Sequence, residues 1–230
     1  MAKRENSIES LRKRCETDLK KIEQDYMDSL HQQQVKTDLQ VDIKVFCDNL
    51  RSILDYLAHD IRETHCPTAD SKTRFYFPIL GGKSDFDSQV KRWYPGLETK
   101  VPDLWSYLES IQPYHEEYQW LGIFNRVNNE NKHGNLVAQT RTETEQVRVS
   151  FEGGSVRWNP DSVKFRVGVS IGGVPVDPRT QMPIPHPSQK IERIIWVDFQ
   201  FHGENVSALW LLKQSLDGVA KIAKDIENWL

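Results

Sequence analysis

The last stretch of the chain, residues 209–230, reads LWLLKQSLDGVAKIAKDIENWL and carries the pattern that decides the fold. Its apolar residues recur at alternating steps of three and four, which places them along one side of an α-helix. They are Leu209, Leu212, Leu216, Val219, Ala223, Ile226 and Leu230. A stripe of this regularity needs a second long helix to cover it. We therefore expect a helix over about 206–229 that packs in a bundle.

The covering helices are predicted at the other end of the chain. Residues 5–31 carry a narrow apolar stripe on a charged sequence, and residues 36–64 carry a wider one. The short connection at 32–34 favours two antiparallel helices, whereas the lack of Gly or Pro there leaves one unbroken helix as the alternative. Shorter helices are predicted at 84–93, 102–111 and 115–133.

Before the last helix, apolar and polar residues alternate with the period of a β-strand that has one buried face. The alternation covers residues 147–151, 156–158, 163–171 and 195–201, and Gly153-Gly154 and Gly172-Gly173 punctuate it as turns. Five prolines between Pro175 and Pro187 indicate an extended surface loop. The sequence therefore predicts an antiparallel meander of four to six strands.

Together these elements predict an α+β fold, a bundle of long antiparallel helices with an antiparallel β-meander inserted before the C-terminal helix. The bundle is expected to comprise residues 1–136 and 204–230. The insertion is expected to comprise residues 137–203 and to pack on the bundle, so that the chain forms a single composite domain.

Composition narrows the class of protein. The net charge of −3 gives no strong overall field to attract nucleic acid, so such contact requires a local basic patch. No apolar stretch approaches the roughly 18 residues that span a bilayer, and the first residues lack a signal-peptide core. Cys15, Cys47 and Cys66 lack metal-site spacing. We expect a cytoplasmic protein with reduced thiols and no membrane association.

One predicted helix carries the main chemical set of the chain, Arg126-Val127-Asn128-Asn129-Glu130-Asn131-Lys132-His133. Residues seven apart on a helix lie nearly above one another, about 10 Å apart along the axis. Arg126 and His133 therefore share one edge, with Asn129 and Glu130 near the arginine. A guanidinium binds phosphate, and an imidazole transfers protons near neutral pH. This edge is the candidate site for phosphate chemistry.

The motif lies at the end of a core helix, and together with residues 50–58, 111–114 and 129–133 it resembles the HEPN family of helical-bundle proteins. The resemblance covers about residues 35–136 and extends to the last helix. Many bacterial HEPN proteins are metal-independent ribonucleases of toxin–antitoxin and phage-defence systems. Active members usually carry a polar residue directly after the arginine, whereas this chain has Val127 there and Asn128 next.

The resemblance implies a homodimer, formed through the bundle, in which two copies of Arg126 and His133 face one cleft. His133 then acts on RNA as general base or general acid, and Arg126 binds the phosphate and stabilises transition-state charge. The supporting residues implied are Asn128, Asn129, Asn131 and Lys132. The products are a 2′,3′-cyclic phosphate and a 5′-hydroxyl. No metal or other cofactor is implied, and an antitoxin or another protein is an expected partner.

Arg51 and Asp55, on the second long helix, are candidates to brace this site from a neighbouring element. Asp55 also lies four positions before His59, a spacing that can hold a metal, although surface ion pairs such as Asp55 with Arg51 are the simpler interpretation.

Two alternatives to an enzyme remain open at this point. Arg126 and Glu130 are four apart and can form an ordinary helical ion pair, and His133 can stabilise the helix C-terminus. The same residues also suit a non-catalytic module that binds nucleic acid or a nucleotide, or that dimerises and binds a protein.

Overall fold

The computed structural model describes residues 3–32, 37–133, 139–160, 162–201, 204 and 206–230, with backbone only at 29–32, 131–133, 139–146 and 193–199. The fold is α+β and divides into two compact units. Unit 1 comprises Met1–Thr140 and Gln200–Leu230, and unit 2 comprises Arg141–Phe199. Helices form unit 1, and short antiparallel strands dominate unit 2.

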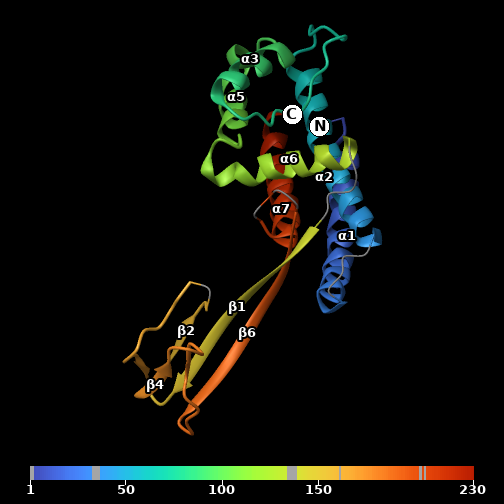
Figure 1. Cartoon of the computed structure of the whole chain (residues 1–230). Coiled ribbons are helices and arrows are strands. Elements are labelled where there is room, and N and C mark those ends of the chain that lie inside the picture. The colour runs from blue at the N-terminus through green and yellow to red at the C-terminus, as the bar shows by residue number, and fades with distance from the viewer. Residues whose placement is uncertain (1–2, 33–36, 134–138, 161, 202–203, 205) are drawn as a thin grey trace. The chain divides into compact units, whose positions relative to one another are not determined.

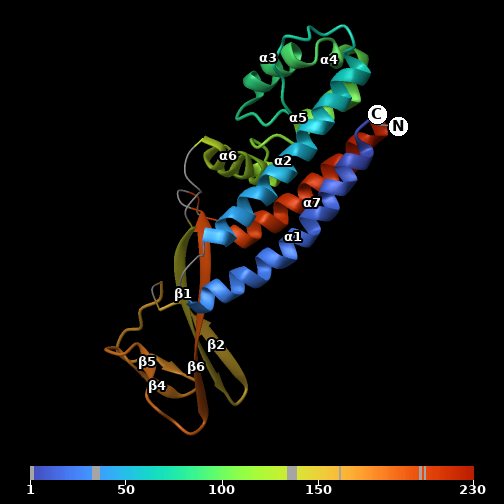
Figure 2. The same cartoon turned by 90° about the vertical axis from the view of Figure 1, so that its right-hand side faces the viewer.

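Three long helices lie side by side in unit 1 (Figure 2): α1 (Glu5–Gln32), α2 (Thr37–His65) and α7 (Ala208–Ile226). The contacts of α1 with α2 run in opposite order along the two helices. Arg4 binds Asp60, the Cys15 thiol faces the carbonyl of Phe46, and Lys21 binds Asp42. The prediction of an antiparallel pair is therefore confirmed, and the single unbroken helix is excluded.

The stripe on α7 is wider than the sequence predicted. Leu212, Leu216, Val219, Ala223 and Ile226 are buried as expected, and so are Ala208, Leu211, Ser215 and Ile222. The extra buried side follows because α7 contacts three helices, namely α1, α2 and α6. Helix α7 begins at a capping residue, since the Ser207 hydroxyl accepts a hydrogen bond from the Trp210 backbone N–H.

The shorter helices are α3 (Lys83–Trp93), α4 (Leu97–Lys100), α5 (Pro102–Ser110) and α6 (Gln119–His133). A 3-10 turn, Glu116–Tyr118, precedes α6, so the α-helix begins four residues later than predicted. Figure 1 shows α6 crossing α2 and α7, and it packs on both. At the crossing with α7, the ring of Trp120 lies against Gly218, where an added Cβ would meet Cζ2 at 2.2 Å.

Unit 2 holds two three-stranded sheets. The strands β1 (Gln139–Phe151), β2 (Gly154–Trp158) and β6 (Gln189–Phe201) pair in the order β2-β1-β6. The strands β3 (Ser170–Ile171), β4 (Val174–Asp177) and β5 (Met182–Pro183) form the second sheet. A buried cluster of Val147, Val149, Trp158, Ile171 and Val176 is the core of this unit.

Two strand predictions were wrong. The expected strand over 163–171 is mostly irregular, because the side-chain amide of Gln181 takes the place of a neighbouring strand. Gln181 accepts a hydrogen bond from the Phe165 N–H at 2.6 Å and donates to the Phe165 carbonyl at 3.1 Å. The proline-rich stretch expected as a loop contributes β4 and β5. The strands therefore form two small sheets instead of one meander.

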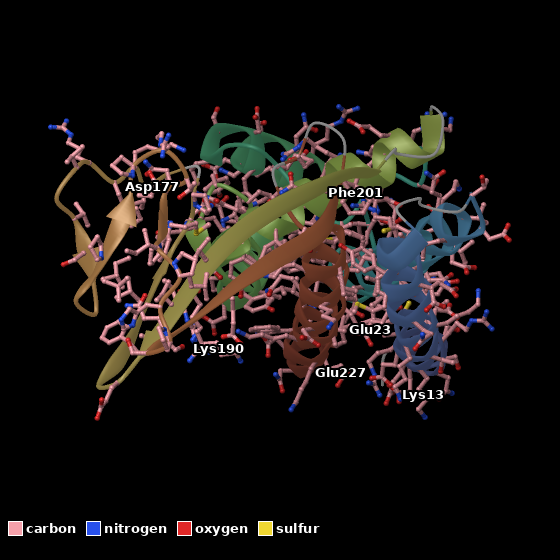
Figure 3. The ribbon with its side chains drawn as sticks, turned by 60° about the horizontal axis from the view of Figure 1, so that its bottom comes forward. Lys13, Glu23, Asp177, Lys190, Phe201 and Glu227 are labelled. Carbon is pink, nitrogen blue, oxygen red and sulfur yellow. The ribbon has the colours of Figure 1, made fainter. Side chains whose placement is uncertain are left out.

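Charged side chains cover the outer side of the long helices, as Lys13 and Glu23 show on α1 (Figure 3). Glu23 joins α1 to α7 through an ion pair with Lys213 at 2.7 Å. The three cysteines are free and buried, in accord with reduced thiols. None of the helices that the structure describes is both long and apolar enough to cross a membrane.

Candidate functional site

Arg126 lies on the exposed side of α6 and is held by a carboxylate that is distant in sequence. Its side chain is 58% exposed, and it binds Glu204 with two parallel contacts, Nε to Oε1 at 2.6 Å and Nη2 to Oε2 at 3.0 Å. The hydrogen bond to Glu204 and the nearby charges of Glu204 and Glu130 raise the pKa of Arg126. The guanidinium is therefore a permanent cation with a bidentate partner.

The other residues of the motif have different positions. Asn128 is fully buried on the side of α6 that packs into unit 1, and its amide atoms have no hydrogen-bond partner among the described residues. Since Val127 is buried as well, the side chains of the two residues after Arg126 face the core of unit 1. Asn129 is exposed and lines a pocket. The predictions for the side chains of Asn131, Lys132 and His133 lie outside the described residues.

The pocket beside α6 has a volume of about 330 Å³. Its polar lining comes from two helices, with Arg51 and Asp55 on α2 and Asn125 and Asn129 on α6. Its apolar lining consists of Tyr76, Phe77, Ile79 and Trp93. The structure thus brings together three residues that the sequence singled out, Arg51, Asp55 and Asn129, but places Arg126 outside the lining.

Arg51 is the central cation of this pocket. Its side chain is 10% exposed, and its Nη1 donates to Asn125 Oδ1 at 3.2 Å. Asp55 Oδ1 lies 3.1 Å from Nη2, but the angles between the two groups are not those of a hydrogen bond, and Oδ1 has no other donor in the described part of the chain. Of the five N–H groups of this guanidinium, one has a hydrogen-bond acceptor among the described residues. Arg51 therefore retains unused donors beside a cavity.

The aromatic wall of the pocket is braced from behind. The rings of Tyr76 and Trp93 meet edge to face, with centroids 6.0 Å apart. The buried Tyr94 hydroxyl donates to the Tyr76 carbonyl at 2.8 Å. Arg62 donates to the Trp93 carbonyl and stacks over Phe75, 4.4 Å from the ring centre. Because these contacts fix the backbone behind both rings, the wall is formed before any ligand binds.

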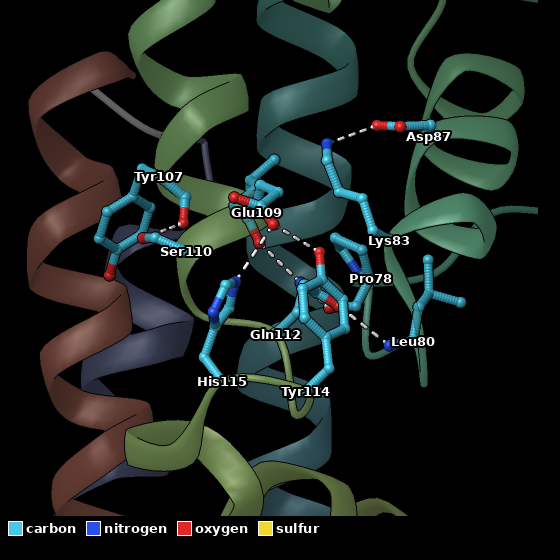
Figure 4. Close-up of polar contacts among 11 residues, drawn as sticks. Pro78, Leu80, Lys83, Asp87, Tyr107, Glu109, Ser110, Gln112, Tyr114 and His115 are labelled. Atoms are coloured by element: carbon cyan, nitrogen blue, oxygen red, sulfur yellow. Dashed lines mark hydrogen bonds and ion pairs between the residues drawn. The ribbon is translucent and has the colours of Figure 1, made fainter.

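A second brace holds the segment that carries Phe77 and Ile79 (Figure 4). Gln112, which is fully buried, accepts from the Leu80 N–H at 2.9 Å and donates to the Pro78 carbonyl at 3.1 Å. It also donates to the Leu108 carbonyl at 2.6 Å. One side-chain amide thus replaces a strand partner for this segment.

Glu109 anchors the loop that leads to α6. It accepts hydrogen bonds from the Tyr114 hydroxyl at 2.7 Å and from His115 at 3.1 Å (Figure 4). Partial burial raises the pKa of Glu109, but these two hydrogen bonds outweigh it and hold the pKa below its usual value. The carboxylate thus ties the residues after Pro113 to the end of α5.

The alternative metal site is not assembled. The His59 ring packs on Phe75 at 4.7 Å, and His65 Nε2 bonds the Trp229 carbonyl. Asp55 forms an ion pair with Arg51 instead. Within the described part of the chain, no three His, Cys, Asp or Glu residues gather closely enough to hold a metal ion.

Comparison with known proteins adds no relative. No family model matches the chain, and no match was found among curated proteins or solved structures. Tyr76, Trp93 and Asn125 line the pocket but were not predicted from the sequence. Asn125 had a usable signal, since it lies four positions before Asn129 on the same side of α6. No spacing pattern pointed to Tyr76 and Trp93, because their place in the pocket depends on the three-dimensional path of the chain.

Proposed function

We propose that the protein is a metal-independent endoribonuclease with an HEPN-like bundle, and that Arg126 and His133 are its catalytic residues. One observation carries the proposal: α6 is helical from Gln119 to His133. Positions 126 and 133 therefore lie two turns apart, about 10 Å along the axis, on one edge of a regular helix. Arg126 is largely exposed and permanently charged, as a phosphate-binding residue must be.

The proposed reaction is an internal transfer at phosphorus. A base removes the proton of the ribose 2′-OH, the 2′-oxygen bonds to phosphorus, and the bond from phosphorus to the 5′-oxygen breaks. A general acid gives the leaving 5′-oxygen a proton, so the products are a 2′,3′-cyclic phosphate and a 5′-hydroxyl. His133 suits both proton transfers near neutral pH, and Arg126 stabilises the charge that develops on phosphate oxygens. Two histidines are needed at once, so the proposal includes a homodimer.

In the proposed reaction, Glu204 orients Arg126 and competes with the RNA phosphate for it. It orients the Arg126 guanidinium through two hydrogen bonds and must be displaced by the RNA phosphate, which offers a similar pair of oxygens. Glu204→Gln removes the competing charge but keeps the shape of the side chain. The variant is expected to bind RNA more tightly, seen as a lower KM.

The test is cleavage of a structured RNA pool by the purified protein in excess EDTA. His133→Ala and Arg126→Ala should lose cleavage, whereas His186→Ala is the matched control, an exposed histidine in unit 2. A 2′-deoxy substitution at the cleaved position should also block the reaction, since it removes the nucleophile. Equal cleavage by wild type and His133→Ala would refute the proposal, and so would cleavage that needs a divalent metal.

A non-catalytic binder of nucleic acid or nucleotides is the second candidate. The bidentate pair of Arg126 with Glu204 favours it, because the proposed catalytic cation is already occupied. This reading predicts RNA or nucleotide binding without cleavage at any pH between 5 and 9. Binding that survives in both His133→Ala and Arg126→Ala would favour it over the enzyme.

A further inference from the structure

We infer that the pocket formed by Arg51, Asp55, Asn125, Asn129, Tyr76 and Trp93 is a binding site for a guanine base. The pocket lies within unit 1 and has a volume of about 330 Å³, at the lower end of the range of roughly 300–1,000 Å³ for ligand sites. That size suits a single base with its ribose. Recognition of a guanine base is a property separate from the proposed cleavage chemistry.

Charge decides between a base and a phosphate. Asp55 lies 3.1 Å from the Arg51 guanidinium, so the two side chains together are close to neutral. A phosphate at Arg51 would face the Asp55 carboxylate at short range and would be repelled by it. A neutral ring that offers acceptors to the arginine and donors to the carboxylate meets no such repulsion.

Guanine has that arrangement of groups. Its O6 and N7 accept the two N–H groups of an arginine, the commonest specific contact of arginine with a base. Its N1–H and exocyclic N2–H₂ are donors on the adjoining edge, and an ionised carboxylate is an acceptor only. Arg51 has unused donors, and the Asp55 side chain beside it is 37% exposed, so one base can contact both side chains. Adenine, cytosine and uracil each present fewer of these groups.

The aromatic wall supplies the flat contact that a base requires. Tyr76 is 48% exposed, so its ring is accessible to a ligand, and it meets Trp93 edge to face. Stacking on an exposed aromatic ring is a main source of affinity for single-stranded nucleic acid. Asn125 and Asn129, which come from α6, add amide groups to the lining.

The pocket and the proposed catalytic edge both use residues of α6. Asn129 lines it, and position 133 is one helical turn further along, about 6 Å. A guanosine in the pocket would therefore sit beside the phosphate to be cleaved. This last step rests on the proposed function, whereas binding of the base does not.

The first experiment is calorimetric titration of the full chain with guanosine, GMP, AMP, CMP, UMP and inorganic phosphate. We expect guanosine and GMP to bind similarly and the other nucleotides to bind roughly 5- to 150-fold more weakly, the preference that one bidentate base contact confers. Equal affinity for the four nucleotides would overturn the inference. Competition of inorganic phosphate with GMP, or no GMP binding at millimolar concentration, would overturn it as well.

Variants with matched controls locate the site. Asp55→Asn should lose the guanine preference, whereas Asp48→Asn should keep it. Both carboxylates lie on α2 and pair with a cation four positions earlier, but Asp48 does not line the pocket. Tyr76→Ala should weaken GMP binding roughly fivefold or more. Trp210→Ala removes an equally exposed aromatic from α7 and should change nothing. Loss of preference in both members of a pair, or in neither, would refute the assignment.

His133→Ala separates the two proposals. If it binds GMP as wild type does but no longer cleaves RNA, both proposals are supported. A wild-type protein that cleaves RNA without binding GMP would refute the guanine pocket alone. A protein that binds GMP with the stated preference but never cleaves RNA would refute the nuclease and leave the pocket in place.

Discussion

Replacement of Gln112 by methionine tests how the wall of the pocket is held. Methionine has a similar length and fits an apolar site, but it makes none of the three hydrogen bonds to Leu80, Pro78 and Leu108. A typical intramolecular hydrogen bond contributes about 1 kcal/mol net, so we expect the free energy of unfolding to fall by about 3 kcal/mol. In a unit of this size, such a loss lowers the melting temperature by roughly 6–12 °C.

The assay is urea unfolding followed by circular dichroism at 222 nm, which reports on unit 1 because all the described α-helices belong to it. Gln24→Met is the control, since Gln24 is exposed and makes one hydrogen bond to Asp28 within α1. The control should change stability by less than about 0.5 kcal/mol. A loss below about 1 kcal/mol in Gln112→Met would show that this side chain does not hold the 78–80 segment.

Three further predictions concern packing and ionisation. Gly218→Ala gains helix propensity of about 1 kcal/mol but drives a methyl group into the Trp120 ring. We therefore expect urea unfolding to show a lower free energy of unfolding for this variant. A variant more stable than wild type would contradict the close contact. Hydrogen bonds from Arg4 and Lys3 lower the pKa of Glu63 to about 2. The free energy of unfolding of wild type should therefore exceed that of Glu63→Gln by its full amount above pH 4.5, and the difference should vanish as the pH falls toward 2. A constant difference over that range in pH-dependent melting would refute this. Burial raises the pKa of Cys15 to about 12 and also that of Cys47, so a thiolate-specific reagent should label the native protein far more slowly than the urea-unfolded one. Equal labelling rates would contradict their burial.

The helices could be predicted because their stripes are long and regular. Residues 5–31 and 36–64 were expected, and α1 and α2 span Glu5–Gln32 and Thr37–His65. Each stripe covers many turns, so one misplaced residue does not alter the pattern. The start of α6 was predicted too early, because a 3-10 turn has nearly the same sequence pattern as the first turn of an α-helix.

The strands were harder to predict because alternation reports burial and not pairing. Val163, Phe165 and Val169 pack against the core of unit 2, as their alternation indicated, but the backbone of Phe165 pairs with the Gln181 side chain. No spacing rule foresees that one glutamine amide satisfies a peptide group sixteen positions away. Val167, in the same alternating run, is 88% exposed.

The candidate site could be predicted only in part. Arg51, Asp55 and Asn129 do lie together, whereas the partner of Arg126 is Glu204, and the sequence suggested Glu130. Glu204 is 78 residues away and reaches Arg126 because the chain returns to unit 1 after β6. Contacts of that sequence separation depend on the three-dimensional path of the chain, which local patterns do not contain.

The chain leaves unit 1 once, after Thr140, and returns once, at Gln200. Between these points, the described residues include a hydrophobic cluster of their own. Because unit 2 has a hydrophobic cluster of its own, we expect calorimetry to resolve two heat-absorption peaks, one for each unit.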